Sequence, residues 1–324
     1  MVHVQEAPAS LAFPLNSQAG HRDGMVEEAA GMGWNVIWSG RGSRLGSVDM
    51  GDPEAVFMEL KRMAGYDAHE LDFRALKAYH DSIFRAMGSP RSVYEVGCGC
   101  GANLYLMQLD GVRVGGIDYS PAMVETARRV LGPGVSELSC GEAKDMPVGI
   151  RYDAVLSNSV FAYFPSLDYA RAVLDRMALK ADTAVIVDVH DADMKDEYLG
   201  MRRGMIPGYD EKYAGLDKLF VPRSFFEEWA EMSGFSARFE RPSVEGYWNA
   251  PYVYTAVLVR EGGRRARDGR MAHGGLRHIC DEDDGRRQRG PHRQMRVRMR
   301  DGRSAPLRPP RVPEPLPRPL GRRL

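Results

Sequence analysis

Short apolar runs alternate along the chain with segments in which apolar residues recur every three or four positions. Runs with the length and composition of buried strands lie at residues 92–96, 112–117, 135–140, 152–158 and 183–189. Segments with helical spacing lie between them at residues 102–110, 121–131 and 167–180. Buried strands that alternate with helices are typical of a parallel sheet covered on both faces. The pattern therefore predicts an α/β protein with a doubly wound sheet.

Two helices are predicted before this alternating region. Asp52 followed by Pro53 is a typical helix start, and the helical pattern that begins there ends at Gly65. A second helical pattern ends at Gly88. The preceding residues 1–52 show weak periodicity and many small residues, so we expect an irregular arm or lid with one short helix near residues 25–32.

Further elements are predicted after the fifth strand. Residues 222–235 have helical spacing, and residues 236–242 and 252–260 alternate like two strands joined by a long hairpin. Glycine and proline occur at close intervals in residues 200–220, which predicts a mobile segment there. We therefore expect one domain over residues 53–260, without internal repeats.

The charge distribution separates the last residues from this domain. The formal net charge is zero, yet residues 261–324 contain 18 Arg, no Lys and only 8 acidic residues, so the rest of the chain is acidic. This Arg-rich and Pro-rich tail has no aromatic residue for base stacking and too little apolar surface for a core. We expect a disordered tail without a nucleic-acid partner, and its composition resembles translation of a GC-rich message outside the selected frame. Activity should then survive truncation after Arg260.

Composition also sets expectations for compartment and metals. The sequence shows neither a signal peptide nor an apolar run long enough to span a bilayer, which favours a cytoplasmic protein without a membrane partner. The four cysteines, Cys98, Cys100, Cys140 and Cys280, lack zinc-site spacing. We expect them to be reduced and mostly structural, with no bound metal, although metal binding by the Cys-x-Cys pair is an alternative.

A glycine-rich turn follows the first strand. In the stretch VYEVGCGCGANL, Gly97, Gly99 and Gly101 allow a sharp turn and close approach of a ligand to the backbone at the start of a helix. Nucleotide-like ligands bind at such turns. Gly97-x-Gly99-x-x-Ala102 also satisfies a variant of the dinucleotide fingerprint, so NAD(P) is one candidate ligand.

Acidic residues at the strand ends favour a different ligand. Glu95 lies two residues before the turn, where its carboxylate suits a cationic group better than a pyrophosphate. Asp118 ends the second strand, where it can accept hydrogen bonds from ribose hydroxyls. Glu142 follows the third strand, where an adenine edge could be read. A tight turn and solvated acidic residues would be the purely structural explanation of each feature alone.

Together these motifs resemble the class I S-adenosylmethionine-dependent methyltransferases, over roughly residues 70–260. The resemblance rests on the glycine turn with Glu95, on Asp118, and on the segments GEAKDMP and YDAVLSN. It implies a Rossmann-like seven-stranded sheet with the last strand antiparallel, and S-adenosylmethionine as cofactor with S-adenosylhomocysteine as product. The cofactor-binding residues that it implies are Glu95, Gly97, Cys98, Gly99, Gly101, Asn103, Asp118, Tyr119, Glu142, Ala143 and Asn158.

Transfer of an activated methyl group needs mainly positioning, and a hydroxyl acceptor would gain from a general base. His190 follows the fifth strand beside Asp188 and Asp191, and an imidazole titrates in the useful range, so it is the candidate base. A surface histidine in an acidic loop is the alternative interpretation.

Aromatic residues near the same sheet edge are candidates for substrate binding. They are Tyr163, Tyr209, Tyr247, Trp248 and Tyr252, with Phe161 and Tyr213 nearby, and they could enclose an apolar or cationic small molecule. Core packing is the alternative explanation for some of them. Trp34, Trp38 and Arg41 of the arm could close over the site as a lid.

The predicted function is methyl transfer to an amine or hydroxyl of a small-molecule biosynthetic intermediate, of the kind met in antibiotic biosynthesis. An oxidoreductase that uses NAD(P) and a cofactor-binding protein without catalysis are the alternatives. The acidic domain would repel phosphates, which argues against a nucleic-acid substrate. The oligomeric state is left open, with a homodimer as one possibility.

Overall fold

The computed structural model describes residues 48–66, 72–242 and 246–262. The predicted lid residues Trp34, Trp38 and Arg41, the short helix near residues 25–32 and the tail after residue 262 lie outside the described residues. The predictions for these segments therefore stay predictions. No helix in the described part of the chain is both long and apolar enough to cross a membrane.

A seven-stranded sheet forms the centre of the described fold, in the order β3-β2-β1-β4-β5-β7-β6. Its strands are β1 (Ser92–Val96), β2 (Arg113–Asp118), β3 (Glu137–Cys140), β4 (Ala154–Asn158), β5 (Thr183–His190), β6 (Phe235–Glu240) and β7 (Val253–Arg260). The first five strands pair in parallel, and β7 runs antiparallel to both β5 and β6. The predicted fold, including its antiparallel last strand, is confirmed.

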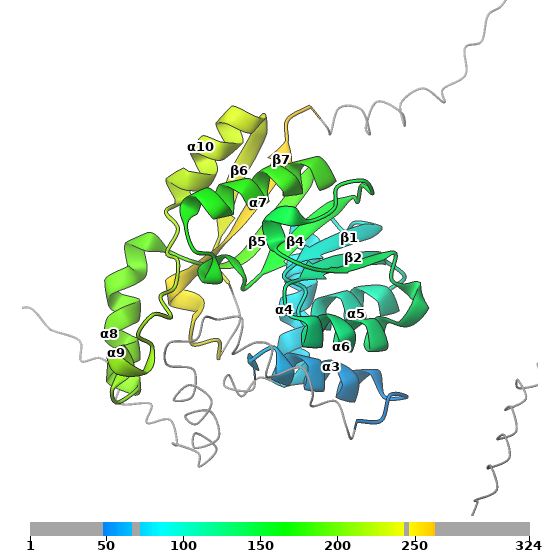
Figure 1. Ribbon diagram of the computed structural model, residues 1–324, viewed down its shortest axis with the longest axis horizontal. Helices are drawn as coiled ribbons and strands as arrows, with labels where there is room; N and C mark the ends of the chain where they lie inside the picture. The colour runs from blue at the N-terminus through cyan, green and yellow to red at the C-terminus, as the bar shows by residue number, and fades with distance from the viewer. Residues whose placement is uncertain (1–47, 67–71, 243–245, 263–324) are drawn as a thin grey trace, which may run out of the picture. The chain divides into compact units, whose positions relative to one another are not determined.

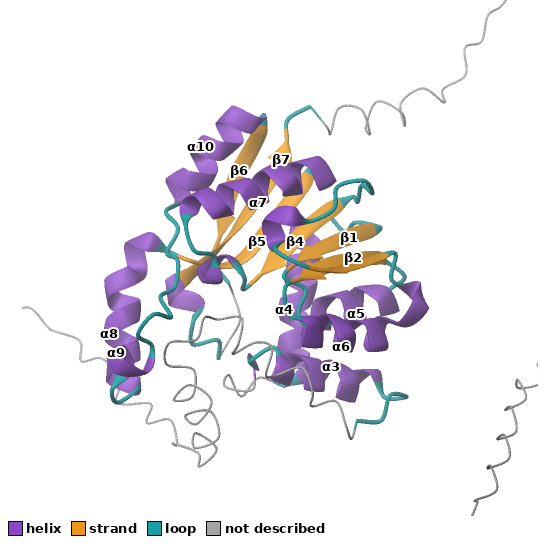
Figure 2. Ribbon diagram, viewed as in Figure 1, coloured by secondary structure: helices purple, strands orange, loops and turns teal. Residues whose placement is uncertain are grey.

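Helices cover both faces of this sheet (Figures 1 and 2). One face packs against α3 (Pro53–Met63), α4 (Phe73–Ala86), α5 (Ala102–Leu109) and α6 (Pro121–Leu131). The other packs against α7 (Leu167–Lys180) and α10 (Arg223–Ser233). Successive side chains of a strand enter opposite cores, as Val93 and Tyr94 of β1 do, which explains why the parallel strands are continuous apolar runs.

The helix boundaries follow the local chemistry of the sequence. The Asp52 carboxylate accepts hydrogen bonds from the backbone N–H groups of Glu54 and Ala55 at 3.0 and 3.2 Å. Ser120 caps α6 in the same way, and Gly234 ends α10 in the left-handed conformation. Short 3-10 turns lie at Gly132–Gly134, Ala143–Asp145, Phe161–Tyr163, Ala192–Met194 and Ala250–Tyr252.

Residues 200–220 differ from the predicted mobile segment, because two helices occupy much of this part of the chain. Helix α8 covers Lys195–Met205 and the short α9 covers Tyr209–Lys212. Tyr198 of α8 is buried against the ring of His190, with the ring centroids 4.8 Å apart. Helix α8 has few apolar residues and only Tyr198 among its residues is buried, so the apolar signal of a helix is weak there and tertiary packing supplies the stability.

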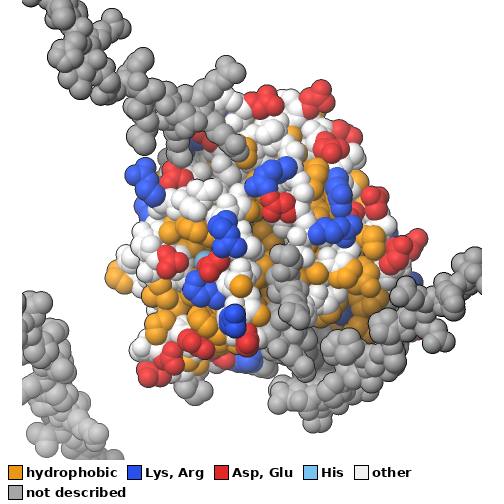
Figure 3. Space-filling view, turned by 180° about the vertical axis from the view of Figure 1, so that it is seen from behind, with side chains coloured by type: hydrophobic (Ala, Val, Ile, Leu, Met, Phe, Trp, Pro, Cys, Tyr) orange, Lys and Arg blue, Asp and Glu red, His pale blue; other side chains and the backbone are white. Residues whose placement is uncertain are grey.

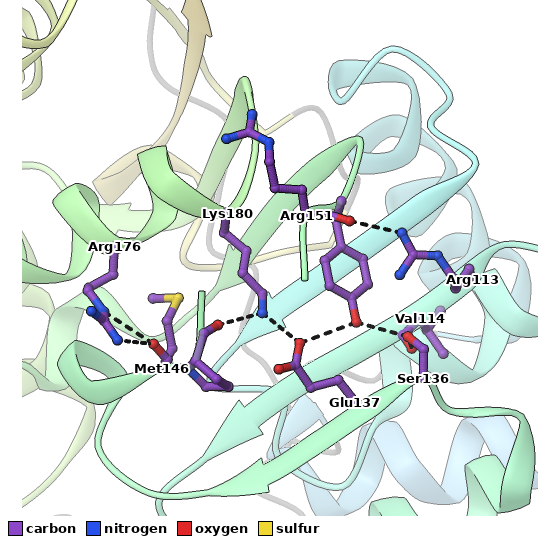
Figure 4. Close-up of polar contacts among 10 residues, drawn as sticks. Arg113, Val114, Ser136, Glu137, Met146, Arg151, Arg176 and Lys180 are labelled. Carbon is purple, nitrogen blue, oxygen red and sulfur yellow. Dashed lines mark hydrogen bonds and ion pairs between the residues drawn. The ribbon is translucent and has the colours of Figure 1, made fainter. Parts of the chain in front are cut away.

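A buried polar network joins the end of α7 to the edge of the sheet (Figure 4). The Lys180 ammonium is fully buried and donates hydrogen bonds to Glu137 Oε2 at 2.6 Å and to the Pro147 carbonyl. It also lies 4.1 Å from the ring centroid of Tyr94. A buried charge needs such partners, so Lys180 is a structural residue of the fold.

Candidate functional site

A cavity of about 700 Å³ opens at the carboxyl ends of the parallel strands. Its wall is formed by the glycine turn after β1, the ends of β2, β4 and β5, the end of α3, part of α8 and residues 247–249. Open α/β sheets bind ligands at this edge, at the point where the strand order reverses, which here lies between the paired strands β1 and β4. The cavity is therefore the candidate functional site.

The glycine turn forms one wall because its backbone adopts conformations that favour glycine. Gly97, Gly99 and Gly101 have φ angles of 72°, 53° and 83°. A Cβ atom on Gly97 would lie 2.3 Å from Cγ2 of Val160, so no larger residue fits there. A Cβ on Gly99 would meet no protein atom within 4 Å. The turn thus presents bare backbone to the cavity.

Asp118 at the end of β2 lies against this turn. Its carboxylate accepts hydrogen bonds from the backbone N–H of Gly99 at 2.8 Å and of Ser120 at 2.9 Å. Burial raises the pKa of Asp118 above its ordinary value, and the two N–H groups oppose that change. The carboxylate is held rigidly at the cavity wall with further acceptor capacity.

Glu95 on β1 is 2% exposed and borders the same cavity. Its Oε1 accepts a hydrogen bond from Asn103 Nδ2 at 2.7 Å, whereas its buried Oε2 has no hydrogen-bond partner. Burial raises the pKa of Glu95 from 4.5 to about 8. A buried carboxylate oxygen without a partner is costly, and a cation bound in the cavity would satisfy it.

Lys61 of α3 is a cavity residue that the sequence analysis missed. Its Nζ donates a hydrogen bond to Asn103 Oδ1 at 2.8 Å, and its side chain is 2% exposed. Burial lowers the pKa of Lys61 from 10.5 to about 8, while the charge of Glu95 acts in the opposite direction. The available signal was the position of this lysine on the apolar side of its helix, four residues after Phe57.

Asp188 lies on the cavity wall in a bulge of β5, with a φ angle of 57°. Its carboxylate, 2% exposed, accepts hydrogen bonds from four hydroxyl groups. The donors are Tyr66 at 3.4 Å, Tyr79 at 2.8 Å, Ser159 at 2.6 Å and Tyr247 at 2.7 Å. These hydroxyls allow a carboxylate to stay buried next to the ends of β4 and β5.

His190 is the last residue of β5 and is 3% exposed, so it is a buried cavity residue and not a surface histidine in a loop. Its Nδ1 is buried without a hydrogen-bond partner. Burial, followed by the charges of Lys218 and Arg202, lowers the pKa of His190 well below 6.5. The imidazole is therefore neutral at physiological pH.

Comparison with known proteins identifies the region around this cavity. Residues 93–181 match a family model described as a methyltransferase domain. The chain therefore contains a methyltransferase domain. This match confirms the predicted resemblance to the class I S-adenosylmethionine-dependent methyltransferases.

Individual relatives of this methyltransferase domain are distant. A malonyl-[acyl-carrier protein] O-methyltransferase of Acetivibrio thermocellus is 29% identical over 120 residues, which are 36% of this chain and 42% of that protein. A nonribosomal peptide synthetase of Emericella nidulans is 31% identical over 138 residues, which are 39% of this chain and 5% of that protein. The chain thus spans less than half the length of these two relatives.

Solved structures similar to the methyltransferase domain include magnesium protoporphyrin IX methyltransferase from Synechocystis PCC 6803, crystallised with bound SAH. That chain is 20% identical, with a TM-score of 0.43, and the match covers 58% of this chain and 86% of that one.

The remaining predicted cofactor residues of the methyltransferase domain lie around the same cavity. Tyr119, Ala143 and Asn158 line it together with Glu142, whose Oε2 accepts a hydrogen bond from the Tyr169 hydroxyl at 2.6 Å. Cys98 also lines the cavity, and its buried thiol has a pKa above the ordinary value because of burial. The raised pKa keeps the Cys98 thiol protonated near neutral pH, and its contact with a cofactor stays a prediction.

The predicted substrate residues of the methyltransferase domain divide into two groups. Tyr163, Tyr247 and Trp248 line the cavity. Tyr209 and Tyr252 are not among the lining residues: Tyr209 stacks on Tyr213, and Tyr252 packs edge-on against Tyr198. Phe161 is fully buried in the core beside Phe226, as the packing alternative expects. Contacts of Tyr209 and Tyr252 with a substrate stay predictions.

Proposed function

We propose that the protein transfers a methyl group from S-adenosylmethionine to an amine or hydroxyl group of a small molecule. The observation that carries this proposal is the unpaired, buried Oε2 of Glu95 above the glycine turn. It offers a binding position for an ammonium group, next to a second carboxylate, Asp118, on the neighbouring strand.

The residues around the cavity fit S-adenosylmethionine. Glu95 would bind the ammonium of its methionine part, Asp118 its ribose hydroxyls, and Glu142 and Ala143 would border its adenine. When bound, the cofactor supplies a methyl group that its sulfonium makes electrophilic. The chain's own task is then to hold the acceptor in line and to exclude water, and orientation of this kind contributes roughly 7–11 kcal/mol.

NAD(P) fits the same cavity less well. Its pyrophosphate would approach the glycine turn, where the carboxylates of Glu95 and Asp118 both lie on the wall. Two nearby carboxylates oppose a negatively charged ligand, whereas they favour one that carries an ammonium and a ribose.

A small-molecule acceptor is supported by the surface. Figure 3 shows one face of the molecule on which basic and acidic side chains are interspersed with hydrophobic ones. The described residues on that face form no extended basic surface of the kind that holds a phosphate backbone. An acceptor small enough to enter the cavity is therefore favoured. Independently of the acceptor, the cytoplasm remains the proposed compartment.

Thermal unfolding of the full chain with S-adenosylhomocysteine, S-adenosylmethionine and NAD tests this function. At 100 times its dissociation constant a ligand adds about 2.7 kcal/mol to the free energy of unfolding. We expect the two adenosyl-sulfur ligands to raise the melting temperature and NAD to leave it unchanged. Stabilisation by NAD alone would favour an oxidoreductase, and cofactor binding without turnover on any acceptor would favour a non-catalytic protein.

His190 is the proposed general base for a hydroxyl acceptor. Replacing it with alanine should lower kcat about 10²- to 10⁴-fold for hydroxyl acceptors and much less for amines, which react when they are already neutral. Because the pKa of His190 is lowered, the wild-type rate should fall through protonation of this residue only well below pH 6.5. A His190→Ala variant with the same turnover as wild type at every pH would exclude this role.

A further inference from the structure

Two cationic side chains lie at the end of the cavity beyond β4 and β5. Lys218 and Arg202 both line the cavity, the first from the segment after α9 and the second from α8. The Lys218 ammonium lies 4.8 Å from the ring centroid of Tyr163, and the Arg202 guanidinium lies 5.4 Å from that of Trp248. This end of the cavity is thus both cationic and aromatic.

The Arg202 guanidinium is incompletely neutralised by the described residues. Arg202 makes no ion pair with an acidic side chain of the described residues, and its buried Nε has no hydrogen-bond partner. Burial, followed by the charge of Arg202, lowers the pKa of Lys218 to about 7. The charge of Asp188 opposes this lowering of the Lys218 pKa.

We propose that the acceptor is an acidic small molecule whose carboxylate or phosphate binds between Lys218 and Arg202. An anion there would relieve the repulsion between the two cations and satisfy the Arg202 Nε, since guanidinium and ammonium groups are the usual partners of both anions. The proposal rests on the proposed methyl transfer and specifies its substrate class.

The aromatic walls indicate the rest of the molecule. Tyr163 and Trp248 each lie beside one of the two cations, and Tyr213 lines the same region. Such rings pack well against a flat apolar body. The aromatic residues alone predicted an apolar or cationic ligand, and the two cations change that expectation to an aromatic or otherwise planar acid.

Binding of small probes tests the charge preference directly. Benzoate, phenyl phosphate, benzamide and benzylamine are titrated into the full chain, with and without S-adenosylhomocysteine, and their dissociation constants are measured by calorimetry or by protein-observed NMR. We expect at least one of the two acids to bind about tenfold or more tightly than benzamide and benzylamine, because charge-assisted hydrogen bonds form only with an anion. Whichever of benzoate and phenyl phosphate binds more tightly indicates whether the natural acceptor carries a carboxylate or a phosphate.

Variants locate the binding position. Arg202→Gln and Lys218→Gln should each raise the dissociation constant of the preferred acid about tenfold. Arg203→Gln is the matched control, since Arg203 is the next residue of α8 and pairs with Asp210 on the exposed surface at 3.0 Å. It should bind the acid like wild type.

Several results would overturn the proposal. These are benzamide or benzylamine binding as tightly as the acids, neither acid binding at any soluble concentration, or Arg203→Gln weakening the acid as much as Arg202→Gln. Loss of the acid preference while S-adenosylhomocysteine still stabilises the protein contradicts only the acidic acceptor. Acid binding without any effect of S-adenosylhomocysteine contradicts the methyl transfer instead.

Discussion

Replacing Glu95 with glutamine is expected to raise the dissociation constant of S-adenosylhomocysteine roughly 30- to 1000-fold. The loss of one partner from a buried, hydrogen-bonded charge pair costs about 2–4 kcal/mol in binding. Glu95 Oε2 is the buried carboxylate oxygen left for the ligand's ammonium, because Oε1 is already bonded to Asn103. Isothermal titration calorimetry of wild type and variant measures the change.

The same substitution should leave the ligand-free protein as stable as wild type, or more stable. The folded pKa of Glu95, about 8, lies above its ordinary value of 4.5, so folding favours the protonated carboxyl. Stability from this group is present below pH 4.5 and is lost as the pH rises toward 8, whereas glutamine has no such loss. Urea unfolding at pH 5 and pH 8 should therefore show the variant gaining relative to wild type at the higher pH.

Glu125→Gln is the control for both measurements, since Glu125 is 74% exposed on α6. It should change neither cofactor binding nor the free energy of unfolding. A Glu95→Gln protein that binds S-adenosylhomocysteine like wild type would contradict the role assigned to Glu95. One that is strongly destabilised without ligand would contradict the pKa argument.

Replacing Asp188 with asparagine is expected to lower the free energy of unfolding by about 3 kcal/mol. The carboxylate accepts four hydroxyl hydrogen bonds while 2% exposed, and an amide would turn an N–H group toward some of these donors. Asparagine tolerates the left-handed backbone of Asp188, so strain is not the source of the loss. Urea unfolding measures the change.

Two further variants test whether the loss comes from the Asp188 carboxylate. Tyr247→Phe removes a single donor and should cost about 1 kcal/mol, because one acceptor position loses its partner while the others remain. Asp193→Asn, on the exposed turn after β5, should have no effect. If the free energy of unfolding of Asp188→Asn lies within about 0.5 kcal/mol of the wild-type value, the hydroxyl cluster does not depend on a charged acceptor.

The sheet and the cavity wall formed by the glycine turn, Glu95 and Asp118 could be predicted from the sequence because their signals are local. The spacing of apolar residues along the chain indicates strands and helices. Caps such as Asp52 and Ser120 lie next to the helices that they begin. The glycine turn, Glu95 and Asp118 occupy neighbouring positions on β1 and β2, so parallel pairing brings them together. The antiparallel position of β7 came from the family resemblance.

On the side of the cavity beyond β4 and β5, the sequence indicated His190 and three of the aromatic residues, but not the charged and hydroxyl groups whose contacts join distant parts of the chain. Asp188 accepts hydrogen bonds from Tyr66 and Tyr79, which lie 122 and 109 positions earlier in the chain, and from Tyr247, which lies 59 positions later. Lysine is usually exposed, so the only local sign for Lys61 was its position on the apolar side of α3, and the sequence around Lys218 gave no sign that it lines the cavity. Helix α8 was missed because its stability comes from Tyr198 packing against His190, a contact invisible in the periodicity of residues 195–205.

The hydroxyl cluster around Asp188 also joins residues that are synthesised at different times. Three of its donors, Tyr66, Tyr79 and Ser159, are translated before Asp188, and the fourth, Tyr247, is translated after it and shortly before β7. A nascent chain that ends before Tyr247 therefore lacks one of the four donors and also β7, which pairs with β5. We expect the cavity wall to close only when the final hairpin leaves the ribosome, so that cofactor binding reports completion of the domain.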